Sequence, residues 1–481
     1  MSRIFLCRFP ETHYICTNFH HETERIRIQR FTIPRDSSLS CLFFVPMRKG
    51  LLLKNGLMMT GPGLMVPRDV FIVDGLIQAV REFIPVPDGV DTETEVIDLS
   101  GMLLTYGFAD LHVHFREPGA PQKETIRTGS LAAARGGYTT VCAMPNLDPA
   151  PDAPETIAIE QAIIDRDACI EVLPYATITR GRKGLEPVDF EALKGRCVAF
   201  SDDGSGVQKD DVMLAAMRRA AELDCILAAH CEDNTLLRGG YIHDGRWCAA
   251  HGHKGICSES EWGQIARDLE LAAKTGCRYH VCHVSTQESV ALIREAKHSG
   301  VRATCETAPH YLVLCEDDLQ EDGRFKMNPP LRSAEDRAAL IEGLKDGTID
   351  AVATDHAPHT AREKSRGLAG SAMGIVGLET AFPVLYTALV RSGKLSLERL
   401  LDALSATPRR IFRLGGALRE GERADLTAID LGAEYIINSR TFLSKGHATP
   451  FDGMAVRGAV RMTWKDGRLV WKDPDYQNGK A

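Results

Sequence analysis

The stretch GFADLHVHFREPG, residues 107–119, ends an apolar run with two histidines one residue apart and an arginine two residues further on. Side chains of a β-strand alternate between its two faces, so His112 and His114 share a face and can reach one metal ion. The alternative interpretation is a strand whose histidines fall on one face by chance. The rest of the chain decides between the two.

Similar apolar segments recur along the middle of the chain. They are LLTYGFADLHVH (103–114), YTTVCAM (138–144), IEVLPYA (170–176), CVAFSD (197–202), CILAAHC (225–231), RYHVCHV (278–284), VRATCET (301–307) and IDAVATDH (349–356). Patterns with a period near 3.6 residues, such as DVMLAAMRRAAEL (211–223), lie between most of them. Strands and helices that alternate in this way predict an α/β fold, a (β/α)8 TIM-like barrel. A doubly wound open sheet competes, but no G-x-G-x-x-G follows the first strand.

Both ends of the chain have a different pattern. GLLLKNGLMM (50–59), DVFIVDGLIQAV (69–80) and AVRGAVRMTWKDGRLVWKD (455–473) are apolar or alternating runs with turn residues between them. The KDG in the last run predicts a hairpin turn. We therefore expect a small β-sandwich domain built from residues 47–101 and 420–481, beside a metal-dependent barrel over residues 102–419.

Residues 1–46 do not fit this plan. They show no clean period, and they lack the continuous apolar core of a signal peptide. Met47 then opens the first strand pattern. We expect residues 1–46 to be a non-native-looking, disordered N-terminal extension that arises from an upstream start choice.

Composition limits the function. The formal net charge of −8 argues against nucleic-acid binding through a broad basic face, and no apolar run is long enough to span a membrane. The 14 cysteines are scattered without C-x-x-C pairs, which indicates a reducing, cytoplasmic compartment. Cys231 and Cys282 adjoin strand-end histidines. We expect both thiols to pack in the core, facing away from any site that the histidines form.

Polar side chains stand where the apolar segments end. In chain order they are His112 and His114, Asn146, Asp203, His230, His283 and Asp355. Because the chemistry of a (β/α)8 barrel collects at the carboxyl ends of its strands, these side chains are expected to meet. Imidazole and carboxylate suit zinc, and four histidines with two aspartates exceed one tetrahedral site. The pattern predicts two Zn²⁺ per chain, about 3.5–4 Å apart, with a shared bridging group.

These residues also have structural interpretations. A lone strand-end histidine is more often a hydrogen-bonded structural residue, and Asp203 beside Asp202 and Gly204 fits a plain turn. Neither interpretation explains why the residues recur in phase with the strands. The metal site is therefore favoured for the whole set.

HVHFREPG together with MPN, DDGSGVQ, AHCED, CHVS, NPPLR and ATDHAPH resembles the amidohydrolase superfamily, and within it the bacterial class I dihydroorotases, over about residues 47–475. The resemblance implies that His112, His114 and Asp355 bind the more buried zinc. It implies that His230 and His283 bind the second. Many relatives bridge the metals with a carboxylated lysine. Asp203 falls where this class uses an aspartate, and Asp202 is the less favoured neighbour.

The resemblance also implies the reaction, the reversible cyclisation of N-carbamoyl-L-aspartate to (S)-dihydroorotate in pyrimidine (UMP) biosynthesis. Asp355 would be the catalytic proton carrier. Arg116 is placed to grip the unreacting carboxylate of the substrate with its forked donors, unless it forms a structural ion pair with Glu117 or a loop carboxylate. The other substrate contacts implied by the family are His114, Asn146, Asn328, His359, Met373 and Gly374. The polar run 359–371 is either a mobile lid or a plain solvated loop.

Two alternatives remain open. One is another cyclic-amide hydrolase, a dihydropyrimidinase (hydantoinase) or an allantoinase, although such enzymes generally carry the bridging lysine and their neutral substrates give no reason for Arg116. The other is an inactive barrel that serves as a partner of aspartate transcarbamoylase. We expect a homodimer that acts on a small molecule, and we keep association with aspartate transcarbamoylase as a further candidate.

Overall fold

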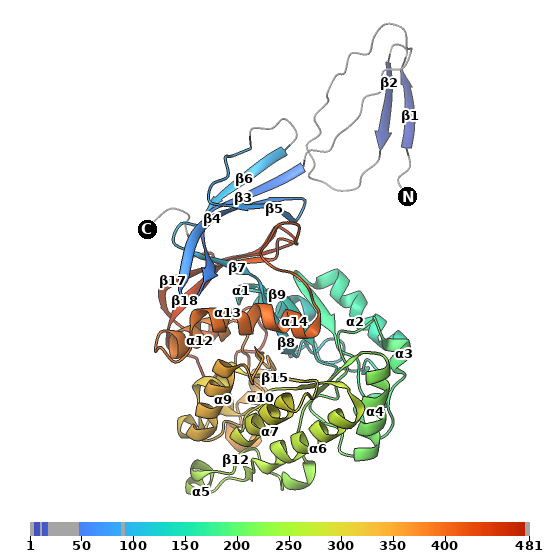
Figure 1. The fold of residues 1–481 in the computed structure, drawn as a ribbon, viewed down its shortest axis with the longest axis vertical. Coiled ribbons are helices and arrows are strands. Elements are labelled where there is room, and N and C mark those ends of the chain that lie inside the picture. Colours follow the sequence, from blue (N-terminus) through green and yellow to red (C-terminus); the bar gives the residue numbers. More distant parts are fainter. Residues whose placement is uncertain (1–3, 10–11, 18–47, 88–91, 477–481) are drawn as a thin grey trace.

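Strands from both ends of the chain meet in one eight-stranded sheet. The computed structural model describes residues 4–9, 12–17, 48–87 and 92–476. The sheet has the order β19-β18-β17-β7-β3-β4-β5, and β6 pairs with β3 (Figure 1). Its strands are β3 (Arg48–Gly61), β4 (Leu64–Val73), β5 (Leu76–Arg81), β6 (Thr92–Asp98), β7 (Leu103–Tyr106), β17 (Leu426–Ile436), β18 (Ala455–Lys465) and β19 (Arg468–Lys472).

Two tight hairpins close this sheet at neighbouring points. Asp74 and Gly75 join β4 to β5, and Asp466 and Gly467 join β18 to β19. All four residues have positive φ, between 50° and 79°, as two-residue hairpin turns require. The turn expected at KDG is thereby confirmed. A Cβ on Gly467 would lie 3.1 Å from the Cα of Gly75, so the hairpins pack closely at their tips.

The middle of the chain alternates parallel strands with helices. Its parallel strands are β8 (Phe108–Val113), β9 (Tyr138–Ala143), β10 (Glu171–Pro174), β11 (Ile226–Ala229), β14 (Arg278–Val281), β15 (Ala303–Thr307) and β16 (Ala351–Val352). They form two sheets, β10-β9-β8 and β11-β14-β15-β16. Parallel bridges from Phe200 to Ala176 and to Leu227 join the sheets on one side, and the bridge Val113–His356 joins them on the other.

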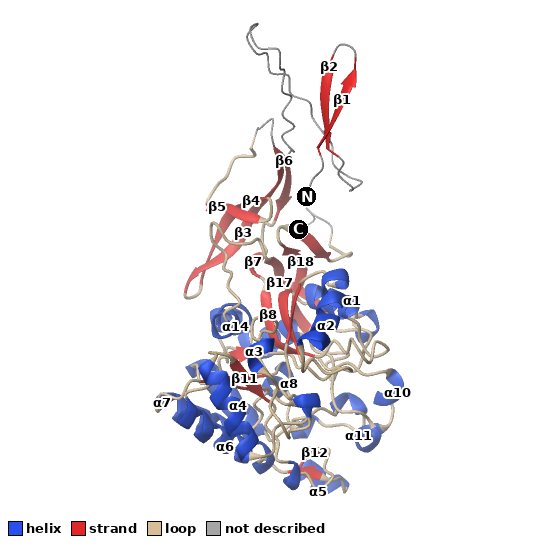
Figure 2. Cartoon of the chain, turned by 90° about the vertical axis from the view of Figure 1, so that its right-hand side faces the viewer, coloured by secondary structure: helices blue, strands red, loops and turns tan. Residues whose placement is uncertain are grey.

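Helices cover these strands (Figure 2). They are α1 (Ile126–Arg135), α2 (Pro154–Asp167), α3 (Phe190–Leu193), α4 (Asp210–Glu222), α5 (Arg246–His251), α6 (Glu259–Thr275), α7 (Gln287–His298), α8 (Pro309–Val313), α9 (Ala334–Asp346), α10 (Ala361–Lys364), α11 (Gly367–Gly370), α12 (Ala381–Leu385), α13 (Leu397–Leu401) and α14 (Thr407–Phe412). Short helical turns are η1 (Arg180–Arg182), η2 (Asn234–Leu236), η3 (Glu316–Asp318), η4 (Gly323–Phe325), η5 (Tyr386–Val390), η6 (Asp402–Ala406) and η7 (Ser439–Thr441), and β12 (Ile242–His243) pairs with β13 (Gly255–Ile256). Apolar faces of the helices pack on the strands, as Ile265 of α6 and Val290 of α7 do in one core cluster with Leu227. The amphipathic pattern over 211–223 thus corresponds to a real helix, α4.

The segment expected to be one strand, 103–114, is two. Leu103–Tyr106 pairs with β17 and β3 in the sheet of the chain ends, whereas Phe108–Val113 pairs with β9. Gly107 stands between them, and a Cβ there would lie only 2.2 Å from the Thr139 side chain. The crossing between the two parts of the molecule therefore lies at Gly107 rather than near residue 101. The segment 197–202 forms isolated bridges rather than a strand, two at Phe200 and one between Cys197 and Lys194.

Part of the N-terminal segment is described. Residues 4–9 and 12–17 form the antiparallel strands β1 (Ile4–Phe9) and β2 (Thr12–Thr17). The remainder of the expected extension, 18–46 included, lies outside the described residues. Within the described ranges, no helix combines the length and apolar character needed to cross a bilayer.

Candidate metal centre and substrate site

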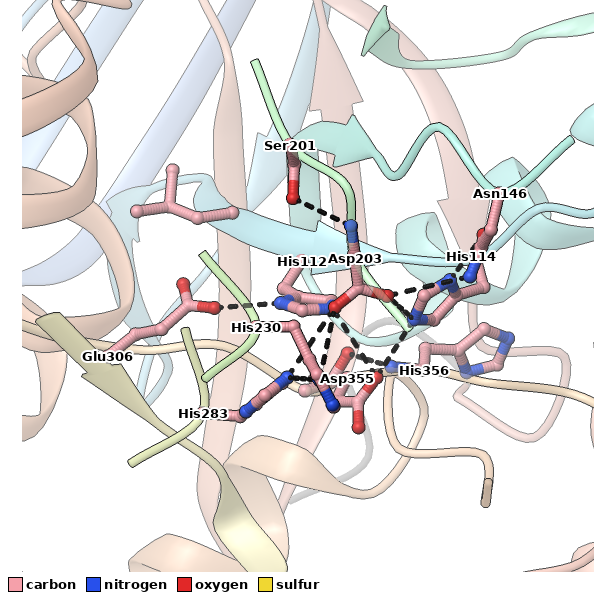
Figure 3. A network of polar contacts seen from close by, with 12 residues as sticks. His112, His114, Asn146, Ser201, Asp203, His230, His283, Glu306, Asp355 and His356 are labelled. Atoms are coloured by element: carbon pink, nitrogen blue, oxygen red, sulfur yellow. Dashed lines mark hydrogen bonds and ion pairs between the residues drawn. The ribbon is translucent and has the colours of Figure 1, made fainter. Parts of the chain in front are cut away.

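The Asp203 carboxylate lies among the four histidines of the strand ends (Figure 3). Its Oδ1 is 3.4 Å from His112 Nε2, 3.6 Å from His230 Nδ1 and 3.5 Å from His283 Nε2. Its Oδ2 is 3.5 Å from His114 Nε2. One carboxylate thus faces two pairs of imidazoles, the arrangement that a bridging ligand between two metal ions requires.

Hydrogen bonds from behind orient the first pair of histidines. His112 Nδ1 lies 3.0 Å from Glu306 Oε1, and His114 Nδ1 lies 2.8 Å from Asn146 Oδ1. With an acceptor behind Nδ1 of each ring, Nε2 of each ring faces Asp203 and Asp355. A carbonyl or carboxylate behind a histidine is the usual support of a metal ligand.

The second pair is arranged differently. His230 Nε2 lies 3.5 Å from Glu232 Oε2, which leaves His230 Nδ1 facing His283 Nε2 at 2.9 Å. His230 would therefore bind through Nδ1 and His283 through Nε2. Asp355 Oδ1 lies 3.0 Å from His114 Nε2 and 3.6 Å from His112 Nε2, on the side of the first pair.

Three residues of the site hold left-handed backbone conformations. The φ angles are 33° at His283, 48° at Asp355 and 58° at Arg116. Residues other than glycine rarely adopt such φ values, at a cost of about 1–3 kcal/mol each. The strain is concentrated where these side chains must converge, as it commonly is at functional sites.

The buried atoms and charges of this cluster fit a bound cation. His112 Nε2 and Asp203 Oδ1 are buried and have no hydrogen-bond partner among the described residues. Burial alone would raise the pKa of Asp203, but the surrounding histidines hold it well below its ordinary value. The ligand atoms of His112, His114 and Asp355 lie within 4.8 Å of one another, as do those of His112, Asp203 and His283. A dication would supply the partner that these atoms lack.

Arg116 stands beside the cluster without a structural ion pair. No carboxylate of the described residues forms a salt bridge with it, and its Nε is buried without a hydrogen-bond partner. Glu117, the partner considered from the sequence, instead accepts a hydrogen bond from Ile126 N at 3.0 Å. Burial lowers the pKa of Arg116, an effect opposed by Asp355 and Asp203. A half-buried guanidinium without an ion pair is suited to an anionic ligand.

The other residues expected to contact the substrate form two groups, one around His359 and one around Asn328. His359 Nε2 donates to Met373 O at 2.7 Å, and a Cβ on Gly374 would lie 3.1 Å from that nitrogen. Burial, together with Arg116 and Lys123, lowers the pKa of His359 to about 3, so the ring is neutral. Asn328 Nδ2 donates to Glu232 Oε1 at 2.9 Å, while its Oδ1 is buried and unpartnered.

The residues next to the candidate metal ligands have different surroundings. The Asp202 carboxylate accepts from Ile178 N at 2.8 Å and from Thr179 N at 3.1 Å, which occupies it away from the histidines. Cys231 Sγ lies 3.1 Å from the Tyr279 hydroxyl, in the core as expected. Cys282 also packs in the core, as expected. Its Sγ lies within 4.8 Å of ligand atoms of His112 and of Glu306, the carboxylate behind that ring.

Sequence reasoning missed two acidic residues of the site, Glu306 and Glu232. Glu306 is the second-to-last residue of the strand VRATCET, near the strand end that identified the histidines. Glu232 follows His230 by two residues, the spacing that joins His112 to His114. The strand position of Glu306 and the spacing of Glu232 could therefore have identified both residues from the sequence.

The chain is similar to known proteins in sequence and in fold. A family model described as dihydro-orotase-like matches residues 101–289. Dihydroorotases of Bacillus cereus (strain B4264) and Bacillus caldolyticus are each 51% identical over 88% of this chain and 98% and 99% of their own lengths. Among solved structures, an L-hydantoinase (dihydropyrimidinase) from Arthrobacter aurescens matches with a TM-score of 0.77 and 26% identity, over 88% of this chain and 96% of that one. The α/β fold is thus shared with hydantoinases, and the much closer sequence relatives are dihydroorotases. The chain belongs to the dihydroorotase family.

Proposed function

We propose that this chain is a dihydroorotase, an enzyme that catalyses the reversible cyclisation of N-carbamoyl-L-aspartate to (S)-dihydroorotate in de novo pyrimidine synthesis. The single observation that carries the assignment of the site is the Asp203 carboxylate, which lies within 3.6 Å of nitrogens of all four histidines. Together with the unpaired Arg116 it accounts for both requirements of this reaction, a metal centre and an anchor for an anionic substrate.

Two Zn²⁺ ions per chain fit the donors. His112, His114 and Asp355 would hold one, His230 and His283 the other, and Asp203 would bridge them. Bound zinc supplies Lewis acidity toward the amide carbonyl and lowers the pKa of bound water to about 7. No carboxylated lysine is needed, because Asp203 would occupy the bridging position.

Asp355 is the residue placed to carry the proton. Although burial opposes ionisation, the histidines around Asp355 hold its pKa far below its ordinary value, so the group is an ionised carboxylate at neutral pH, the form that a proton acceptor requires. In ring opening it would accept the proton of the attacking water and deliver it to the ring nitrogen that leaves. In ring closure the same proton moves in the opposite direction.

The substrate is held by residues on two sides of the metal centre. Arg116 would grip the unreacting carboxylate with two parallel hydrogen bonds. Asn146, His114 and His359 would complete that end. The free Oδ1 of Asn328 and the backbone of Met373 and Gly374 would contact the ring.

The runner-up is a hydrolase of neutral cyclic amides, such as hydantoin or allantoin. Such a substrate gives no role to the unpaired cation of Arg116, whereas dihydroorotate carries a carboxylate that can pair with it. An inactive partner protein would be expected to lack some metal ligands, but all six are present and converge. Neither alternative is favoured.

One experiment tests this assignment. The purified full-length chain, loaded with zinc, is offered dihydroorotate, hydantoin and allantoin in parallel, and its zinc is counted on the same sample. We expect ring opening of dihydroorotate alone, with about two zinc ions per chain. Turnover of the neutral rings instead would overturn the substrate assignment and leave the metal site standing.

The architecture follows the same proposal. We infer that the two parallel sheets and their bridges are one (β/α)8 barrel over about residues 107–419, with the sheet of the chain ends as a separate small β-sandwich domain. Residues 1–46 would stand outside the working fold, since relatives matched over 98–99% of their length align with 88% of this chain.

The cellular setting is inferred in the same way. The eleven cysteines with described side chains are all free thiols, which supports a cytoplasmic location. A homodimer and association with aspartate transcarbamoylase stay predictions, which light scattering of the protein alone and mixed with that enzyme would measure.

A further inference from the structure

The segment between β16 and α12 is not a plain solvated loop. Residues 359–374 contain the short helices α10 and α11, and the side chain of Lys364 is buried, at 6% exposure. Its Nζ donates to three backbone carbonyls: Lys326 O at 3.0 Å, Ala372 O at 2.8 Å and Gly374 O at 2.7 Å. Every proton of the ammonium group is therefore used on main-chain acceptors.

These carbonyls belong to the two segments that are proposed to contact the substrate ring. Ala372 and Gly374 flank Met373, whose own carbonyl accepts from His359. Lys326 lies two residues before Asn328, and its carbonyl also accepts from Gly374 N at 3.1 Å. Lys364 thus stands where the two segments are tied together.

No carboxylate of the described residues forms a salt bridge with Lys364. The nearby acids are engaged elsewhere, because Glu363 pairs with Lys123 at 2.9 Å and Asp322 pairs with Arg324 at 2.9 Å. Burying an amino group without a counter-ion costs free energy unless hydrogen bonds compensate for the lost solvation. An apolar side chain avoids this cost but cannot make the hydrogen bonds. A methionine would fill a similar volume without making these bonds.

Other contacts hold the same segment at its far end. Lys326 Nζ donates to Ala369 O at 2.9 Å, and Glu321 Oε1 accepts from Leu368 N at 3.2 Å. Loss of Lys364 would therefore leave the segment attached but remove two of the hydrogen bonds that hold the Ala372–Gly374 backbone, those to Ala372 O and Gly374 O. This separation makes the role of Lys364 testable by itself.

We propose that Lys364 is a positioning residue for substrate binding, because its side-chain amino group holds the backbone of Lys326 and of Ala372–Gly374 in the arrangement that receives the substrate ring. The inference rests on the proposed function, in which Asn328, Met373 and Gly374 contact that ring. Lys364 touches neither substrate nor metal, so its effect should fall on substrate binding rather than on the chemical step.

The test compares Lys364→Met with Arg362→Met, an exposed residue of the same helix α10. We expect Lys364→Met to raise KM for dihydroorotate roughly ten- to a hundredfold, with kcat within about threefold and the zinc content unchanged. Arg362→Met should leave all three values unchanged. Lys364→Gln, which keeps two N–H donors, should give an intermediate KM, and it decides the question if the methionine variant does not fold.

The outcomes separate the two proposals. A folded Lys364→Met with an unchanged KM, or one that loses kcat and zinc in parallel, would overturn the positioning role. A zinc-loaded wild-type enzyme inactive on dihydroorotate would overturn the proposed function itself.

Discussion

Glu306 joins His112 to His280 through its two carboxylate oxygens. Oε1 lies 3.0 Å from His112 Nδ1, and Oε2 lies 3.3 Å from His280 Nε2. Burial would raise the pKa of Glu306, but the two histidines lower it to about 2, so the group is ionised. A charged acceptor therefore fixes the orientation of the ring that faces Asp203.

Replacing Glu306 by glutamine should weaken zinc binding by about ten- to a hundredfold, because the carboxylate that supports His112 is lost. Competition with a chelator, followed by metal counting, measures this. Glu295→Gln on the exposed face of α7 is the matched control. Equal zinc retention by both variants would show that Glu306 supports packing only.

Asn146→Ala distinguishes two roles of that amide. Since its Oδ1 lies 2.8 Å from His114 Nδ1, we expect a loss of zinc affinity of about tenfold or more, in addition to a higher KM. The measurements are zinc titration and steady-state kinetics, with Asn234→Ala on the surface as the control. A raised KM with normal zinc affinity would mean that Asn146 acts only on the substrate.

Arg116→Lys keeps the charge and removes the forked donor. Because a hydrogen bond to a charged group contributes about 1.5–3 kcal/mol, we expect kcat/KM for dihydroorotate to fall roughly ten- to a hundredfold with zinc content unchanged. The exposed Arg180→Lys is the control. Full activity of the Arg116 variant would count against a carboxylate clamp.

The equilibrium of the reaction should depend on pH. Ring closure converts a carboxylate into an amide and consumes one proton, so the ratio of dihydroorotate to N-carbamoyl-L-aspartate should fall about tenfold per unit between pH 6 and 9. Chromatography of mixtures equilibrated from both directions measures the ratio. A flat ratio would refute the assigned chemistry.

Lys364 should also make the free energy of unfolding depend on pH. Burial lowers its pKa to about 7 from an ordinary value of 10.5, with Lys326 adding to the effect and Asp322 opposing it. Between these two values the unfolded state binds more protons, so the free energy of unfolding should rise with pH, by up to about 1.4 kcal/mol per unit. Urea unfolding at pH 7 and pH 9 should show this slope in wild type and lose it in Lys364→Met. The same slope in both proteins would contradict the lowered pKa.

The strand-end residues were predictable because two periodicities coincide in them. His112, Asp203 and His283 end apolar segments, and parallel strands bring their carboxyl ends together whatever the loops do. Glu306 obeys the same rule, but a lone glutamate is so commonly a surface residue that its position alone does not predict a site. The support that Asn146 gives to His114 depends on side-chain rotamers, which no spacing specifies.

Lys364 was unpredictable for a different reason. In the sequence it belongs to a polar run with Arg362 and Glu363, which is typical of solvated loops. Its burial depends on three carbonyls, one of them at Lys326, some 40 residues away in the chain. Main-chain acceptors leave no trace in the side-chain pattern, so such a contact is visible only in the structure.

The pairing of β7 with β17 has a consequence for synthesis of the chain. Leu426 pairs with Tyr106, so the partner of β7 is translated about 320 residues later. At about 5–20 residues per second, β7 waits on the ribosome for roughly 15–60 s with one edge open. During that interval the emerging helices and parallel strands can already assemble. The last strands to be made then complete the sheet, and a truncated product would carry the metal ligands with an exposed edge.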